Sequence, residues 1–212
     1  MSLAFTYTLI APFYDFFIKN TFKSARSKNI QAMGDVTHKK ILVVGIGTGL
    51  DIPLLPQNAI YHGIDITPAM LKKAQNRAEK SNLTIQLEVA DATSLRFHDE
   101  TFDIIIMHLI LAVVPDHSKT LNEACRVLKS DGKILVFDKF LKRNQPAFFL
   151  KMFNPIISRI ATSTDVIFED VLETTPLLTV IDDQKENLNG WFRRIILKKV
   201  DSAPNKSIFP KS

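Results

Sequence analysis

Glycines and aspartates follow three consecutive strand-like runs in this 212-residue chain. The run 41–44 ends in Gly45-Ile46-Gly47-Thr48-Gly49, and Asp65 and Asp91 stand where the next two runs end. A glycine-rich turn lets backbone amides approach a ligand, and a carboxylate accepts hydrogen bonds from both hydroxyls of a ribose. Asp91 is placed to accept from the exocyclic amine of adenine. Each aspartate alone is equally consistent with a turn or cap, but the three features together indicate a nucleotide-like cofactor.

The glycine spacing is compatible with two classes of cofactor. Dinucleotide sites favour G-x-G-x-x-G/A, in which the third small residue lets a helix pack closely. This chain has Leu50 at that position and Gly49 one residue earlier. The observed spacing is instead typical of S-adenosylmethionine sites, where backbone amides approach the methionine portion. A nicotinamide oxidoreductase remains an alternative, disfavoured by Leu50 and by the lack of a Tyr-x-x-x-Lys pair.

An alternation of strands and helices must position these residues. The patterning predicts five strands, two helices capped by Thr67 and Asp116, and a turn at 130–132. Two later strand-like runs, joined by a polar loop, predict a hairpin. The fold class is therefore α/β, a doubly wound, mostly parallel seven-stranded sheet with an antiparallel C-terminal hairpin. The expected strands are 41–44, 60–66, 84–89, 102–107, 133–138, 177–182 and 191–200, and the helices are 68–80 and 118–129.

The composition indicates one globular domain. Hydrophobic residues make up 46% and charged residues 23% of the chain, which excludes wholesale disorder and coiled-coil architectures. Cys125 is the single cysteine, so no internal disulfide can form, and we expect a cytoplasmic protein. The longest apolar run, 104–114, is shorter than the roughly 20 residues that span a bilayer. The histidines lack the short spacing of metal ligands, so we expect no metal site.

The net charge of +5 is unevenly distributed along the chain. An acidic middle, 41–138, separates two basic, Phe-rich flanks, and this pattern does not favour a nucleic-acid partner. The flanks carry amphipathic helical patterns, one beginning near Pro12 and one around 148–159. One reading is peripheral contact with an anionic membrane at its inner face, or a pocket for an apolar acceptor. The other reading is that the aromatic faces pack on the sheet while the lysines are solvated.

Several motifs resemble those of the class I S-adenosylmethionine-dependent methyltransferases. The resemblance covers roughly residues 40–140 and departs at Val43, where the family usually has Glu or Asp. It is carried, in order, by 43–49, Gly63-Ile64-Asp65, Ala90-Asp91-Ala92, Phe102-Asp103 and 126–132.

A closer resemblance is to bacterial phosphatidylethanolamine N-methyltransferases and ubiquinone-pathway methyltransferases. Tyr7, Tyr14-Asp15, the glycine loop and the segment 111–116 carry it. The lipid enzymes tend to have Asn-His-Phe where this chain has 138–140, Asp-Lys-Phe.

The resemblance implies a set of site residues. Candidate catalytic residues are His108 and Tyr14, near the acceptor and the methionine end, and Asp138 in the acceptor region. For His108 the alternative is a core histidine bonded to backbone, for the tyrosines it is packing, and for Asp138 it is a solvated charge. The expected S-adenosylmethionine contacts are Gly45, Gly47, Thr48, Gly49, Asp65, Ile66, Met70, Asp91, Ala92, His108, Tyr7 and Tyr14.

The predicted organisation is a single methyltransferase domain over 1–212. Its parts are a helical lid, a cofactor-binding core, a helical substrate insertion, a hairpin and a tail, at 1–39, 40–140, 141–175, 176–200 and 201–212.

The preferred hypothesis for the function is N-methylation of an aminophospholipid at a membrane surface. The alternatives are methylation of a quinone-like or other soluble small molecule, and non-catalytic S-adenosylmethionine binding that regulates a partner.

Overall fold

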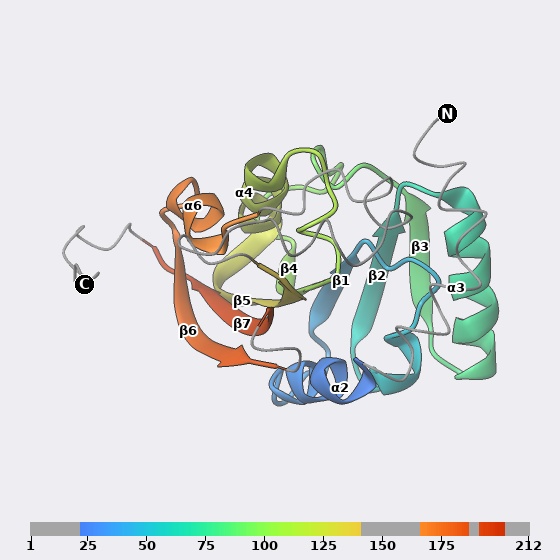
Figure 1. Cartoon of the computed structure of the whole chain (residues 1–212). Coiled ribbons are helices and arrows are strands. Elements are labelled where there is room, and N and C mark those ends of the chain that lie inside the picture. Colours follow the sequence, from blue (N-terminus) through green and yellow to red (C-terminus); the bar gives the residue numbers. More distant parts are fainter. Residues whose placement is uncertain (1–21, 141–165, 187–190, 202–212) are drawn as a thin grey trace.

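The computed structural model describes residues 22–140, 166–186 and 191–201, and its core is one seven-stranded sheet (Figure 1). The strand order is β3-β2-β1-β4-β5-β7-β6. The first five strands pair in parallel, whereas β7 is antiparallel to both β5 and β6. The predicted fold class is therefore confirmed. The strands are β1 Lys40–Val44, β2 Ile60–Asp65, β3 Ile85–Val89, β4 Phe102–His108, β5 Leu128–Lys139, β6 Leu178–Lys185 and β7 Phe192–Lys199.

Helices cover both faces of the sheet, and Figure 1 shows α4 and α6 above it and α2 below it. Successive residues of β1 alternate between two cores, because side chains in a strand point to opposite faces. Leu42 and Val44 pack with residues of α4 and α6, whereas Ile41 and Val43 pack with residues of α2 and α3. The helices are α2 Lys23–Gln31, α3 Pro68–Lys80, α4 His117–Val127 and α6 Phe168–Glu173, with a 3-10 turn at Ile52–Leu54.

The boundary between α4 and β5 differs from the prediction. The helix ends at Val127, and β5 begins at Leu128, five residues before the expected strand. Leu128 pairs with Phe102, and the register then shifts so that Ile104 pairs with Lys133. The predicted turn at 130–132 is thus an irregularity inside a longer strand, with Asp131 at φ 61. Asp116 caps α4 as expected, accepting from the Lys119 amide at 2.8 Å.

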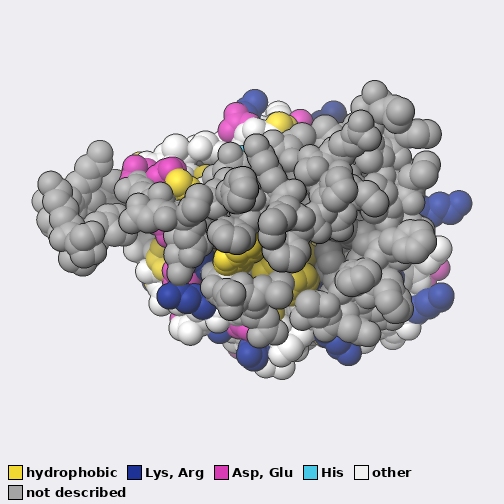
Figure 2. All heavy atoms as spheres, viewed as in Figure 1, with side chains coloured by type: hydrophobic (Ala, Val, Ile, Leu, Met, Phe, Trp, Pro, Cys, Tyr) yellow, Lys and Arg dark blue, Asp and Glu magenta, His cyan; other side chains and the backbone are white. Residues whose placement is uncertain are grey.

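Much of the two predicted flanks lies outside the described residues. This holds for the helix starting near Pro12, for Tyr7 and Tyr14, and for residues 141–165 of the substrate insertion. The flank segments that are described include α2, α6 and the hairpin strands. Figure 2 shows hydrophobic side chains at the centre of the viewed face and Lys and Arg side chains around its rim. In the described parts, no helix is long and apolar enough to cross a membrane.

Candidate cofactor site

A cavity of about 280 Å³ opens at the carboxyl ends of β1, β2 and β4. This is the edge at which open α/β sheets bind ligands, because the loops after parallel strands converge there. Nine of the predicted site residues line the cavity together, although Gly49 and Asp138 do not. The lining comprises Arg26, Gly45, Ile46, Gly47, Thr48, Leu50, Asp51, Ile64, Asp65, Ile66, Thr67, Met70, Ala90, Asp91, Ala92, His108, Leu109, Ile110, Val113, Val114 and Pro115.

The three loop glycines have different roles, although all have positive φ. A Cβ on Gly45 would lie 2.5 Å from the Ile110 side chain, and one on Gly49 would lie 3.1 Å from Cα of Ala74 in α3. A Cβ on Gly47 would meet nothing nearer than the Gly45 carbonyl oxygen at 4.0 Å. Gly49 therefore permits the close approach of α3, whereas Gly47 borders the open space of the cavity.

Alanine substitutions should separate these roles. We expect Gly47→Ala to lower S-adenosylmethionine affinity more than about tenfold, because its Cβ would enter ligand space, at a stability cost of about 1 kcal/mol for the positive φ. Gly49→Ala should lose more than about 2 kcal/mol of stability, since overpacking against Ala74 adds to the same strain. Calorimetric titration and urea unfolding measure the two quantities.

Gly34→Ala is the matched control for backbone strain alone. Gly34 has φ +73, and a Cβ there would meet no atom within 4 Å. If Gly47→Ala binds as tightly as Gly34→Ala does, the open space beside Gly47 is not part of the cofactor site.

The predicted contact Thr48 is held from α3. The Arg77 guanidinium donates to the Thr48 carbonyl at 2.6 Å and to its hydroxyl oxygen at 3.1 Å. Because both bonds end on one loop residue, Arg77 fixes the conformation of the glycine loop from outside the cavity.

Asp65 connects the glycine loop to the start of α3. Its Oδ2 accepts from the Gly47 amide at 2.9 Å, and its Oδ1 accepts from the Thr67 amide at 2.8 Å. Burial raises the pKa of the Asp65 carboxyl, and these backbone hydrogen bonds only partly oppose the effect. Each carboxylate oxygen has a second lone pair, so the carboxylate can still accept from two ligand hydroxyls.

Away from the glycine loop, the cavity is lined by two apolar side chains, Ile66 and Met70, next to the polar turn that contains Asp91. Ile66 is 65% exposed directly after Asp65, and Met70 is buried on the first turn of α3. Asp91 is exposed, and its Oδ1 accepts from the Thr93 amide and hydroxyl at 2.8 and 2.9 Å. Asp91 therefore stabilises a turn, which was the alternative to a ligand contact, and it also lines the cavity. An apolar surface beside a hydrogen-bond acceptor suits a flat heteroaromatic ring.

His108 lies at the end of β4 with both ring nitrogens engaged. Its Nδ1 lies 2.9 Å from Oδ2 of Asp51, and its Nε2 lies 3.0 Å from Nδ2 of Asn29. Nδ2 of Asn29 also donates to the Val136 carbonyl, which fixes the orientation of the amide. The contact with Asn29 therefore places a donor against Nε2, and the contact with Asp51 places an acceptor against Nδ1. A role for His108 as a base stays a prediction, and it requires one of these bonds to break.

Asp138 is 3% exposed and lies away from the cavity lining. Its Oδ2 accepts a hydrogen bond from the Ala112 amide at 3.0 Å, and its Oδ1 accepts one from the amide of the next residue, Lys139, at 2.8 Å. Burial raises the pKa of Asp138 to about 6. The contacts make Asp138 an anchor for the loop after β4, which itself lines the cavity, and direct contact with an acceptor stays a prediction.

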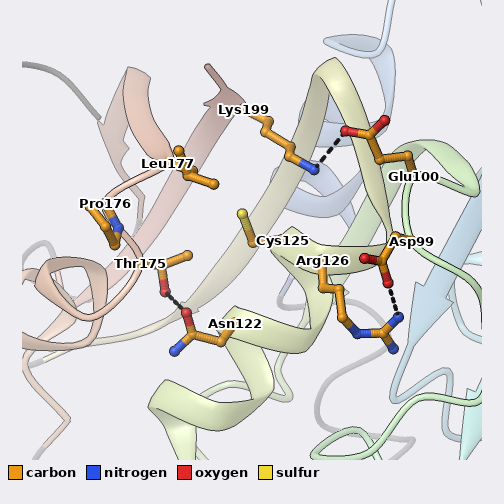
Figure 3. Close-up of a pocket in the computed structure, with 9 residues that line it drawn as sticks. All are labelled: Asp99, Glu100, Asn122, Cys125, Arg126, Thr175, Pro176, Leu177 and Lys199. Carbon is orange, nitrogen blue, oxygen red and sulfur yellow. Dashed lines mark hydrogen bonds and ion pairs between the residues drawn. The ribbon is translucent and has the colours of Figure 1, made fainter. Parts of the chain in front are cut away.

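A second, larger cavity of about 590 Å³ lies beside α4, at the opposite end of the strands, where β4 and β5 begin (Figure 3). Its polar side chains pair with one another. Lys199 lies 3.3 Å from Glu100, Arg126 lies 2.7 Å from Asp99, and Thr175 donates to Asn122 at 3.1 Å. Lys199 also donates to the Leu128 carbonyl at 2.6 Å. Because these groups satisfy each other and lie away from the glycine loop, the smaller cavity is the candidate cofactor site.

Sequence reasoning missed Arg26, Asp51 and the apolar wall formed by Leu109, Ile110 and Val113. Asp51 lies two residues after Gly49, the last glycine of the loop, which is a usable signal, but nothing local links it to Arg26 in α2. Among the described residues, no group of histidine, cysteine and carboxylate side chains is arranged to hold a metal.

A family model described as a methyltransferase domain matches residues 42–136. The chain is 29% identical over 185 residues to the phosphatidylethanolamine N-methyltransferase of Cereibacter sphaeroides, covering 84% of this chain and 89% of that protein. It is 31% identical over 148 residues to the demethylmenaquinone methyltransferase of Tropheryma whipplei, covering 67% of this chain and 61% of that protein. The residues that the family model matches include the glycine loop, Asp65 and Asp91.

A solved structure of an S-adenosylmethionine-dependent methyltransferase from Methanosarcina mazei superposes with a TM-score of 0.62. The two chains are 19% identical, and the match covers 81% of this chain and 97% of the other. At that identity the likeness concerns the fold.

Proposed function

We propose that this chain, which belongs to the class I S-adenosylmethionine-dependent methyltransferases, N-methylates an aminophospholipid at a membrane surface. The observation that carries the proposal is the alignment with the Cereibacter phosphatidylethanolamine enzyme, which extends over most of both proteins. It includes sequence beyond the methyltransferase-domain match, in the flanks where acceptor contacts are expected.

The cavity fits S-adenosylmethionine on three observations. The space beside Gly47 is open, so a ligand can approach the loop backbone. The Asp65 carboxylate is anchored at the end of β2, where a ribose is expected, and the exposed Ile66 offers an apolar surface for adenine. S-adenosylmethionine supplies a methyl group on a sulfonium, which an acceptor lone pair takes in an in-line displacement while the sulfur keeps the electrons of the broken bond.

The protein contributes alignment and exclusion of water. The buried loop after β4, anchored by Asp138, brings Ile110 and Val113 to the cavity as an apolar wall. An amine acceptor must lose its proton before its lone pair can attack. Of the described lining residues His108 is the only imidazole, and its nitrogens are engaged, so we expect the amine to react from its deprotonated form in solution.

Ion pairs in the described C-terminal flank reduce the number of cations that could attract an anionic membrane. Four cations of β7 are paired with carboxylates, which reduces their attraction for anionic lipid. The electrostatic part of the hypothesis therefore does not rest on these four cations of β7. The pairs are Arg193 with Glu169 and Asp183, Arg194 with Asp182 and Glu186, Lys198 with Asp131, and Lys199 with Glu100.

A quinone-like acceptor is the second candidate. It is favoured by the similarity to the Tropheryma demethylmenaquinone enzyme, although that match covers less of both chains. Methylation on carbon, the reaction in the name of the ubiquinone/menaquinone C-methyltransferase of Rickettsia massiliae, would give a product chemically different from an N-methylated lipid.

A methyl-transfer assay on vesicles tests the proposal. We expect N-methylated lipid, detected by mass spectrometry, from phosphatidylethanolamine vesicles and none from phosphatidylcholine vesicles, whose amine is already fully methylated. The rate should rise with added phosphatidylglycerol and fall with salt, because the basic flanks attract anionic lipid.

Other outcomes would redirect the assignment. Turnover of a demethylated quinol but not of phosphatidylethanolamine would favour the second candidate. Binding of S-adenosylmethionine without turnover of lipids, quinols or small amines would favour the non-catalytic regulator.

A further inference from the structure

Arg26 is the only Lys or Arg among the described residues that line the cofactor cavity. It projects from α2 and is 3% exposed. Its Nη1 donates to Oδ1 of Asp51 at 2.7 Å, but its Nε is buried and has no hydrogen-bond partner among the described residues. A buried donor without an acceptor is costly, so an unpaired Nε in a side chain that lines a cavity points to an acceptor supplied by the ligand.

Asp51 stands beside Arg26 as a fixed negative charge. Burial alone would raise the pKa of this carboxyl, but His108 and Arg26 outweigh burial and hold the pKa below its ordinary value. His108 holds the second oxygen through its Nδ1, as described above. The cavity thus presents one positive group, from α2, and one negative group, two residues after Gly49, side by side.

We propose that Arg26 and Asp51 bind the amino-acid end of S-adenosylmethionine, with Arg26 facing its carboxylate and Asp51 its ammonium group. A guanidinium has five donors, and each Asp51 oxygen has a second lone pair, so both side chains can keep their mutual contact while binding the ligand. The family position that usually carries an acidic residue is Val43 here, and its side chain is buried in the apolar core. Asp51 supplies a carboxylate on the same loop.

The arrangement also places the amino-acid end relative to the ribose. Asp65 lies at the end of β2, whereas Arg26 and Asp51 lie beside His108 at the end of β4. The two carboxylates therefore hold opposite ends of one extended cofactor. This inference concerns the cofactor alone, so it holds or fails independently of the proposed acceptor.

Calorimetric titration with paired ligands tests it. S-adenosylhomocysteine has the amino-acid end, and 5′-methylthioadenosine lacks it. We expect Arg26→Gln to weaken S-adenosylhomocysteine by about 10- to 100-fold, the loss of a charge-assisted hydrogen bond, and to leave methylthioadenosine within about twofold. Asp51→Asn should behave in the same way. Lys28→Gln is the control, a cation on the same helix that pairs with Glu186 and does not line the cavity.

An equal loss for both ligands would overturn the proposal, because it would mean that Arg26 only supports the fold of the site. Unchanged affinity for both would overturn it as well. Wild-type protein tests the idea even if the variants fail to fold. It should bind decarboxylated S-adenosylmethionine at least about tenfold more weakly than S-adenosylmethionine, and equal affinity would refute a role for Arg26 at the carboxylate.

Discussion

Replacing Asp65 with asparagine should weaken S-adenosylmethionine binding by roughly 100-fold. The neutral amide has one acceptor oxygen, so it cannot accept from both ribose hydroxyls, and hydrogen bonds to a charged group contribute about 1.5–3 kcal/mol each. The amide would also turn an NH₂ group toward either the Gly47 or the Thr67 amide, which both donate to the carboxylate. Isothermal titration calorimetry measures the affinity.

The affinity should also depend on pH through the same group. Because the pKa of Asp65 is raised by burial, protonation removes the acceptor at a higher pH than for an ordinary carboxyl. Binding by the wild type should therefore weaken on acidification earlier than it would for an exposed aspartate, whereas Asp65→Asn should lack this dependence.

Glu88→Gln is the control for removing a carboxylate near the site. Glu88 is an exposed residue of β3 and does not line the cavity. Should Asp65→Asn bind as tightly as Glu88→Gln, Asp65 takes no part in holding the ribose.

The second large effect is a pH dependence of stability that arises from Asp138. Burial raises its pKa in the folded protein to about 6, from 3.8 for an ordinary aspartate. The folded state therefore binds this proton more tightly, and the stability that the proton contributes is complete below pH 4 and is lost as pH rises through 6. The difference corresponds to about 3 kcal/mol. Other carboxyls, including Asp51 and Asp103, have lowered pKa values and act in the opposite direction.

A comparison with Asp138→Asn isolates this contribution. Urea unfolding at pH 4 and pH 7.5 should show the stability of the wild type, relative to the variant, falling by about 2.4 kcal/mol between the two pH values, most of the full difference. Asp131→Asn is the control on the same strand, since Asp131 is exposed and asparagine tolerates its positive φ. Parallel pH profiles for the wild type and Asp138→Asn would mean that Asp138 does not titrate in this range.

The parts of the site that were predictable are those set by local sequence. The apolar run of β1, the glycine spacing and the aspartate at the end of β2 each follow from neighbours within a few positions. The known direction of ligand binding in parallel sheets then brings them to one edge. Their meeting around a single cavity follows from these rules without knowledge of any side-chain contact.

The buried contacts of His108 were not predictable, because they join distant positions. Its partners Asp51 and Asn29 lie 57 and 79 residues away along the chain. The sequence left open whether this histidine faces a ligand or the core, and the structure shows that it does both, lining the cavity with its nitrogens turned to protein groups.

The start of β5 was misplaced for a different reason. Ser-Asp-Gly is a strong turn signal, and Asp131 does adopt a left-handed conformation. The strand nevertheless pairs with β4 on both sides of Asp131. Leu128, which is fully buried, pairs with Phe102 before it, and Lys133 pairs with Ile104 after it. Tertiary pairing thus outweighed a correct local prediction.

The position of β7 between β5 and β6 has a consequence for synthesis of the protein. While the chain emerges from the ribosome, the β1 to β5 half can assemble, but β5 keeps one edge without its partner until the chain has reached Lys199. At about 5–20 residues per second, that interval lasts roughly 3 to 12 s. Throughout it, the edge of a strand whose residues 134–137 are buried in the finished fold stays open to pairing with other chains. The nascent protein is therefore most vulnerable to aggregation after its cofactor-binding half has been made.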